Sequence, residues 1–273
     1  MELAAVAALL TGIIWGVTPS LYAEASREGG SIRANFWKSL GAFFILSIIS
    51  IVRGDLSLPP PMGLLFIITN ASLGTGIADF LFLKALALIG PGRATPIGFT
   101  YLIWSALLPS IMIGEIFSPK TLLGAAIALA GIWLSSRGGG EWKIKGIVFS
   151  LSASIGWTLS PIAAKLALNY VSEVTLATWN SLLVTLTYGL LSAPAYRVRG
   201  SGRAALGGTL GSGLALVLYF YAVRELGVAI ASLATALAPV VSLVISRFSE
   251  GGTDRASALG SIVTIAGIVI ALL

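Results

Sequence analysis

The sequence predicts an all-α integral membrane protein with ten transmembrane helices, arranged as two inverted five-helix repeats around a central cavity. Three observations support this fold class. The 273 residues are 56% hydrophobic and only 10% charged, whereas about 25% of the residues in soluble domains are charged. The apolar residues fall into ten stretches of roughly membrane-spanning length. Scarce residues recur between the two halves of the chain at nearly constant spacings.

The ten apolar stretches are separated by short polar breaks. A helix needs about 20 predominantly apolar residues to cross the hydrocarbon core. The stretches cover approximately residues 3–23, 31–52, 63–88, 91–114, 119–136, 145–168, 173–193, 205–225, 228–247 and 255–273. A soluble protein with ten such core helices would need more polar surface than this chain has. The first stretch lacks a basic segment before it, so it is interpreted as a retained span rather than a secretory signal.

The internal repeat is marked by tryptophan, proline and glycine. Trp15, Pro19 and Trp37 recur as Trp157, Pro161 and Trp179, since the differences 157−15, 161−19 and 179−37 are all 142. The third span recurs at an offset of 137, with Gly76, Ala85 and Gly90 matched by Gly213, Ala222 and Gly227. Glu115 then matches Glu250, and in the fifth spans Gly124 and Gly131 match Gly260 and Gly267. Each unit therefore holds five spans, and two units with an odd number of spans must be inverted. The predicted divisions are 1–137 for the first repeat, 138–144 for a linker and 145–273 for the second repeat.

Three motifs carry a family resemblance. The first span contains Trp15-Gly16-Val17-Thr18-Pro19, Glu115 closes the fourth span, and Gly124 and Gly131 lie in the fifth. Together they resemble the EamA-type drug/metabolite transporter superfamily over almost the whole chain. The resemblance implies an exporter or exchanger of amino acids, related metabolites or drugs, which works by alternating access around a central cavity.

Charges inside the predicted spans point to a site. Lys38, Asp79 and Lys84 lie within apolar stretches, where a charge at mid-membrane depth costs at least about 2.5–3.5 kcal/mol. Asp79 and Lys84 are five residues apart, about 140° around a helix, so they are poorly placed to pair. A bridge between Lys38 and Asp79 is predicted instead, serving either substrate binding or packing alone. Lys84 is expected to extend its amine to the interface.

The second repeat does not reproduce these charges, because Lys38 aligns with Asn180 and Asp79 with Leu216. The predicted cavity is therefore chemically asymmetric, as a directional polar substrate requires. Aromatic side chains within spans supply further lining residues, although Trp104 and Tyr221 could equally face the lipid interface. The predicted substrate-binding residues are Trp15, Lys38, Asp79, Tyr101, Trp157, Asn180 and Tyr219.

Proline supplies the predicted gating residues Pro19, Pro161 and Pro239. A proline inside a helix removes a hydrogen bond and bends the axis. Pro19 and Pro161 lie near the ends of predicted spans, so ordinary helix termination is the alternative. Pro239 lies inside the ninth span, whereas the first repeat has Leu102 at the matching place. A bend is therefore expected in the second repeat and not in the first, either as a hinge or as a static kink.

The composition also separates classes of function. A secondary transporter of small metabolites fits best, with a non-transporting membrane assembly protein and an integral-membrane lipid-modifying enzyme as the alternatives. The chain has no histidine and no cysteine, and its acids are dispersed, so neither an enzyme nor a metal or cofactor is predicted. No phosphate-binding loop indicates ATP-driven transport. The net charge of +6 comes from single basic residues at span ends, which indicates interfacial anchoring rather than nucleic-acid binding.

Two lines of reasoning give opposite orientations in the cell membrane. When the loops between predicted spans are numbered from the N-terminus, the odd-numbered loops carry eleven Lys and Arg residues and the even-numbered loops carry four. This count places both termini outside, whereas the family resemblance implies both inside. The expected partners are a small-molecule substrate and the lipid bilayer. Proton coupling through Asp79, and the choice between monomer and homodimer, stay open.

Overall fold

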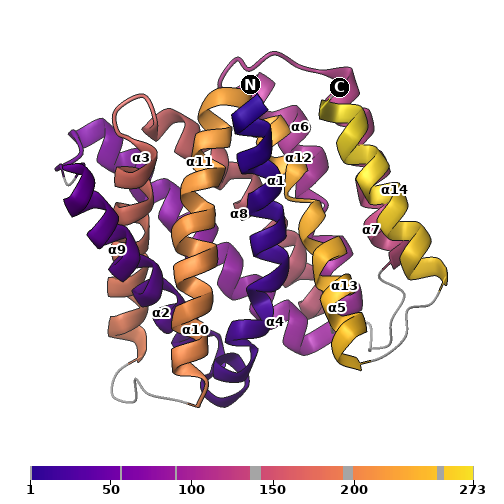
Figure 1. The fold of residues 1–273 in the computed structure, drawn as a ribbon, viewed down its shortest axis with the longest axis horizontal. Coiled ribbons are helices and arrows are strands. Elements are labelled where there is room, and N and C mark those ends of the chain that lie inside the picture. Colours follow the sequence, from indigo (N-terminus) through magenta and orange to yellow (C-terminus); the bar gives the residue numbers. More distant parts are fainter. Residues whose placement is uncertain are drawn as a thin grey trace.

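The protein is a bundle of helices in the computed structural model, which describes residues 2–55, 57–89, 91–135, 143–192, 199–250 and 255–272. Within these ranges the secondary structure is helical, without strands. The long helices stand side by side, and both chain ends lie at the same end of the bundle (Figure 1). This end, with both termini, is called the terminal end below, and the other is called the far end. The all-α fold class is confirmed.

Most helices follow one another after short connections, and several are consecutive segments of one longer helix. Their bounds are α1 Glu2–Val17, α2 Pro19–Arg53, α3 Pro61–Ala71, α4 Asp79–Ile89, α5 Pro91–Gly98, α6 Tyr101–Met112, α7 Pro119–Ser135, α8 Ile144–Ala167, α9 Glu173–Ser192, α10 Ser201–Gly208, α11 Ala215–Leu226, α12 Val228–Ala234, α13 Leu237–Glu250 and α14 Arg255–Leu272. Two π-helical turns, Ser72–Ala78 and Thr209–Leu214, join α3 to α4 and α10 to α11.

Length and composition identify an integral membrane protein. In the part of the chain that the structure describes, six helices are long and apolar enough to cross a membrane: Glu28–Arg53, Pro61–Ala85, Ala94–Met112, Ile144–Ala167, Glu173–Ser192 and Ser201–Leu226. Four shorter apolar helices accompany them: Glu2–Val17, Pro119–Ser135, Val228–Ser242 and Ala258–Leu272. Large apolar side chains such as Phe44, Leu190 and Ile262 are exposed on these helices, as expected for surfaces that face lipid.

The first reversal of the chain lies at Gly30, inside α2. The Thr18 amide donates to the carbonyl of Ile14 at 3.0 Å, so helical bonding continues from α1 into the start of α2. Gly30 has φ 71° and ψ 175°, a backbone conformation that favours glycine because it has no Cβ. The chain therefore turns at the break that the sequence placed between 23 and 31.

The two π-helical turns occupy matching places in the two halves of the chain. Their first residues, Ser72 and Thr209, are separated by 209−72 = 137 positions, the offset found for the third span. Each turn contains two glycines with one residue between them. π-Helical turns are rare and are frequently found at functional sites, and Asp79 directly follows the first one.

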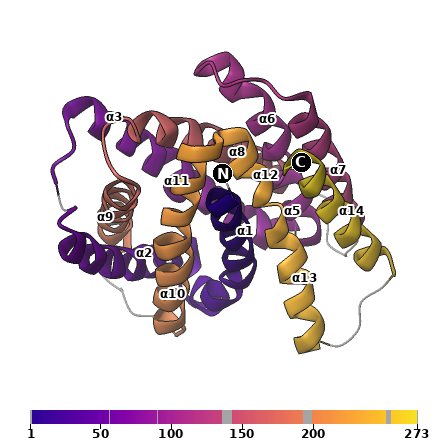
Figure 2. The ribbon, with the colours of Figure 1, turned by 45° about the horizontal axis from the view of Figure 1, so that its top comes forward.

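Glycines set the close contact between α7 and α14. A Cβ built on Gly124 would lie 2.5 Å from the carbonyl oxygen of Gly267, and one on Gly131 would lie 2.5 Å from that of Gly260. Only glycine permits this approach of α7 and α14, which lie side by side in both views (Figures 1 and 2).

The prediction of a bend in the second repeat alone is wrong. The helix is interrupted at residues 99–100, between α5 and α6, and again at 235–236, between α12 and α13. The Thr100 hydroxyl donates to the carbonyl of Ile97 at 2.7 Å, and the Thr235 hydroxyl donates to that of Ser232 at 2.5 Å. Such hydroxyls compete with the helical bonding pattern, so both copies are interrupted although Leu102 is not proline.

Candidate functional site

A line of contacting side chains begins at Trp15 on α1. The Trp15 indole Nε1 donates to the carbonyl of Gly211 at 2.9 Å, in the second π-helical turn. The ring centroids of Trp15 and Tyr219 are 5.1 Å apart. Tyr219 is only 5% exposed, so it faces the interior of the bundle rather than lipid.

Hydroxyl groups continue this line from α11 to α6. The Tyr219 hydroxyl forms a 2.9 Å hydrogen bond with Ser232 Oγ on α12. Thr235, at the interruption after α12, is hydrogen-bonded to the hydroxyl of Tyr101 on α6. Tyr101 is 7% exposed. The interruption in the ninth predicted span therefore supplies polar groups that connect two buried tyrosines.

The line ends at an ion pair. Tyr101 packs edge-on against Trp157 of α8, with the ring centroids 5.9 Å apart and the planes at 71°. The Trp157 Nε1 donates to Asp79 Oδ1 at 2.9 Å, and the other carboxylate oxygen, Oδ2, pairs with the amine of Lys38. The line is called the aromatic relay below, and its members are Trp15, Tyr219, Ser232, Thr235, Tyr101, Trp157, Asp79 and Lys38.

The Lys38–Asp79 bridge that the sequence predicted is present. The Lys38 side chain is 6% exposed and that of Asp79 is 26% exposed, so both charges are largely removed from the surroundings of the bundle. Two groups on different helices share the Asp79 carboxylate at the start of α4: the Lys38 amine of α2 and the Trp157 indole of α8. This arrangement compensates the cost of a charge inside the membrane.

Asn180 lies outside the aromatic relay. Its Nδ2 donates to Asn70 Oδ1 at 2.6 Å, and its Oδ1 accepts from the Thr75 hydroxyl at 2.8 Å. Asn70 Nδ2 in turn donates to the carbonyl of Ser160 at 2.9 Å. Asn180 is 2% exposed, and its amide holds α9 against α3 and the first π-helical turn, while Asn70 extends the cluster to α8. Its predicted role in substrate binding stays a prediction.

The three predicted gating prolines have different positions. Pro19 is the first residue of α2, a position at which proline is common, and its side chain lies outside the described part. Pro161 is buried inside α8 rather than at its end. Pro239 is the third residue of α13, and its ring and missing N–H act on the carbonyl four residues earlier, that of Thr235 at the interruption. Their gating role stays a prediction.

The two remaining aromatic candidates and Lys84 point elsewhere. Trp104 is 47% exposed, so the lipid-facing alternative holds for it, whereas Tyr221 is half-buried. Lys84 is exposed, as expected for a lysine that extends to the interface. Sequence reasoning missed Ser232 and Thr235, although hydroxyl residues inside a predicted span were a usable signal.

Two hollows lie outside the aromatic relay. One, of about 380 Å³, is at the terminal end and is lined in part by Asp55, Tyr170 and Arg224. The other, of about 390 Å³, includes Gly30, Lys84 and Phe149. Neither hollow is lined by a residue of the relay, and the two tyrosines of the relay are buried.

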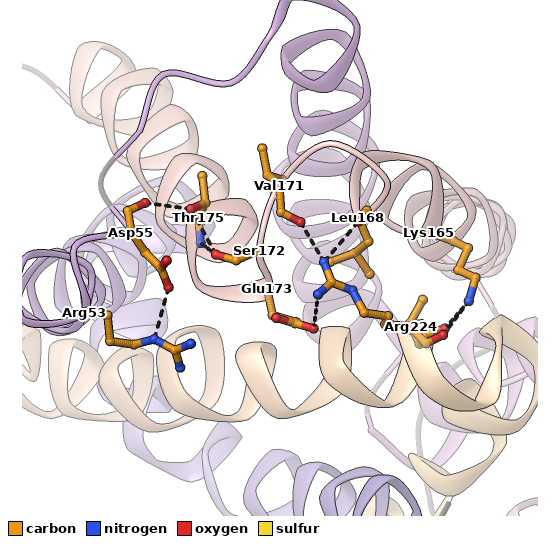
Figure 3. A network of polar contacts seen from close by, with 10 residues as sticks. Arg53, Asp55, Lys165, Leu168, Val171, Ser172, Glu173, Thr175 and Arg224 are labelled. Atoms are coloured by element: carbon orange, nitrogen blue, oxygen red, sulfur yellow. Dashed lines mark hydrogen bonds and ion pairs between the residues drawn. The ribbon is translucent and has the colours of Figure 1, made fainter.

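Basic residues at the terminal end are used in structural contacts (Figure 3). Arg224 pairs with Glu173 at 2.8 Å and donates to the carbonyls of Leu168 at 3.0 Å and Val171 at 2.7 Å. The Lys165 amine donates to the carbonyl of Arg224 at 2.6 Å. Two of the four basic residues in the even-numbered connections therefore tie helix ends together.

Glu115, which closes the fourth predicted span, links the two halves of the chain. Both of its carboxylate oxygens accept from the amide of Val228 at 3.0 Å, at the start of α12. Gly227, the residue before Val228, has φ 85°, and this conformation brings the backbone close to the Glu115 carboxylate. A negative charge at a helix N-terminus is stabilising. The side chain of its repeat mate Glu250 lies outside the described residues.

Comparisons with known proteins agree with this architecture. The chain matches the model of the EamA-like transporter family over residues 2–137 and again over 144–273. A search of curated proteins finds no match. A protein known from a crystal structure is similar over 99% of this chain and 98% of its own, with a TM-score of 0.80 and 18% sequence identity, which shows a shared fold. The chain is an integral membrane protein and belongs to the EamA-like transporter family.

Proposed function

We propose that the protein is a secondary transporter of small metabolites, such as amino acids or related amphipathic compounds, which exports or exchanges them across the cell membrane. The observation that carries this proposal is the aromatic relay, because it runs across the boundary between the two halves of the chain. Trp157 of the later half donates to Asp79 of the earlier half. Transporter sites commonly lie at such a repeat interface.

We further propose that 1–137 and 145–273 are inverted five-helix repeats, with 138–144 as the linker. The family model matches each half separately. The π-helical turns recur at an offset of 137, and the interruptions recur at 136, since 235−99 and 236−100 agree. Both termini lie at one end of the bundle, as an even total number of spans requires. These correspondences favour a rocking motion of one repeat against the other.

The chemistry of the relay suits an amphipathic substrate. Rings from four helices offer flat apolar faces, and the two indoles and two phenols carry polar tips. A substrate could bind between Tyr101 and Trp157, or between Trp15 and Tyr219. It would separate the two rings, and its own contacts with them would replace the contact between the rings. Opening of the relay in the middle would separate α6 from the interruption after α12, where the Tyr101–Thr235 bond joins them.

Substrate-dependent flux in proteoliposomes tests the transporter proposal. Trp157→Ala is expected to reduce flux at least about tenfold, which corresponds to about 1.4 kcal/mol, because it removes a ring contact and a donor to Asp79. The matched control is Trp104→Ala, which removes an outward-facing ring, and it should stay within about twofold. Monodisperse elution of both variants from a sizing column checks folding.

Two outcomes contradict the proposal. Equal losses in Trp104→Ala and Trp157→Ala would remove the relay from transport. Absence of flux in the natural protein, across a panel of amino acids and related metabolites, would favour the membrane assembly alternative. The same panel also addresses substrate identity, because a ligand that binds the native state raises its unfolding temperature.

A second measurement locates the gate. Thr235→Val removes a bond to Tyr101 and one to Ser232, and unpaired buried groups cost about 1–3 kcal/mol each. Pro239→Ala changes a position in the first turn of α13, where a missing N–H costs little. Thr235→Val is therefore expected to slow turnover about tenfold, and Pro239→Ala much less. A larger effect of Pro239→Ala on turnover, with substrate binding intact, would restore the proline as the hinge.

A further inference from the structure

The hollow of about 390 Å³ lies away from the relay, between three separate helices. Its lining comes from α2, α4 and α8: Ser26, Gly30, Ser31, Leu83, Lys84, Leu88 and Phe149. Gly30 is the point at which the chain reverses, so the hollow lies toward the far end of the bundle (Figure 1). A Cβ built on Gly30 would meet nothing within 4 Å.

Lys84 is the charged group of this hollow. Its amine lies 4.5 Å from the ring centroid of Phe80 and 5.8 Å from that of Phe149. Among the described residues, no carboxylate or carbonyl is hydrogen-bonded to this amine. The nearby carboxylate of Asp79 binds Lys38 and Trp157 instead. An ammonium group has three donors, so Lys84 presents a positive charge that an external anion can meet.

Lys84 lies near the end of α4. Lys84 precedes the end of α4 at Ile89 by five residues, which is about 7.5 Å along a helix. Its flexible stem can carry the amine toward the headgroup level. The hydroxyl of Ser31 lines the same hollow, while Leu83, Leu88 and Phe149 give it apolar walls. One site thus combines an anion-binding part with a part suited to a hydrocarbon chain.

We propose that this hollow binds an anionic glycerophospholipid, with the phosphate at Lys84 and Ser31 and an acyl chain against Leu83, Leu88 and Phe149. The far end also carries Arg33, Lys145 and Arg255, whose charges attract anionic headgroups. A zwitterionic lipid fits less well, because its own cation opposes Lys84. A soluble phosphate would leave the apolar walls uncovered.

Thermal unfolding of the delipidated full-length protein in detergent tests the proposal. Phosphatidylglycerol is expected to raise the unfolding temperature more than phosphatidylcholine does, since only ligands of the native state stabilise it. Lys84→Gln should lose at least about half of that extra shift. The matched control is Arg255→Gln, which removes one charge from the same end outside the hollow, and it should keep most of it. Equal losses in the two variants would overturn the proposal in favour of diffuse attraction.

Two further arms keep the test decisive. Ser31→Asp places a carboxylate beside the bound phosphate and should abolish the preference for phosphatidylglycerol, even where Lys84→Gln does not fold. Asp is tolerated there because Ser31 opens the helical piece after Gly30. Glycerol 3-phosphate, which has no acyl chain, should give no shift. If glycerol 3-phosphate raised the unfolding temperature as much as phosphatidylglycerol does, the hollow would be a site for soluble anions and the lipid proposal would be rejected.

Discussion

Asp79→Ala is expected to destabilise the protein by about 3–5 kcal/mol, the usual cost of breaking a buried ion pair from one side. The substitution leaves the Lys38 amine with its side chain only 6% exposed and without its carboxylate. It also removes the acceptor of the Trp157 indole. The expected observation is a lower yield of monodisperse protein and a lower unfolding temperature in detergent. Lys38→Ala should act in the same direction but less strongly, because the Asp79 side chain is 26% exposed and keeps the Trp157 indole as a donor.

A double-mutant cycle tests whether the two charges act as a pair. Lys38→Met combined with Asp79→Leu should be less harmful than the sum of the single changes, by about 0.5–3 kcal/mol. Arg53→Ala is the matched control, because Arg53 pairs with Asp55 at 3.0 Å while its side chain is 59% exposed, and exposed pairs contribute about 1 kcal/mol or less. Strict additivity in the cycle would show that Lys38 and Asp79 do not interact.

Asp79→Asn separates a structural role of this carboxylate from proton coupling. Asparagine keeps an acceptor for the Trp157 indole but cannot exchange a proton. We expect this variant to fold better than Asp79→Ala, and its flux should be compared with and without a proton gradient. Loss of the gradient dependence alone would assign proton transfer to Asp79. Unchanged gradient dependence would make the pair structural, and transport downhill or by exchange.

Gly208→Ala is expected to cause the other large loss, of about 3 kcal/mol or more, because overpacking that moves backbone is costly. A Cβ at this position would lie 1.8 Å from the carbonyl oxygen of Lys38, and one on Gly41 would lie 2.0 Å from that of Ala205. The atoms in the way belong to the backbone, so α2 and α10 would have to separate. That movement starts at Lys38 and would therefore disturb the ion pair as well.

Gly202→Ala on the same helix is the control for this prediction. A Cβ on Gly202 would meet nothing within 4 Å, and alanine is a better helix former than glycine by about 1 kcal/mol. The control variant should therefore unfold at the same temperature as the natural protein or at a slightly higher one. Equal unfolding temperatures for Gly208→Ala and Gly202→Ala would mean that α2 and α10 do not need their close contact.

Much of the relay could be inferred from individual residues. Lys38 and Asp79 were paired correctly because a charge inside an apolar span must find an opposite charge. Trp15 and Trp157 were identified as repeat mates, and the structure places both on the relay with Tyr101 and Tyr219. Asn180 entered the candidate set only as the partner of Lys38 in the repeat alignment, and it lies in another cluster. Alignment relates positions along the chain, but it does not say which neighbours a side chain meets.

The sequence by itself determined the membrane class, the approximate spans, the doubled motifs and the need for a buried ion pair. These properties follow from local sums of hydrophobicity and from the cost of isolated charges, so they need no knowledge of neighbours. Only the tertiary structure decided that the Trp157 indole binds Asp79, that Ser232 and Thr235 join two tyrosines, and that the helix is interrupted in both halves of the chain. Those contacts depend on the rotation of each helix about its own axis, which is set where backbones meet at glycines such as Gly208.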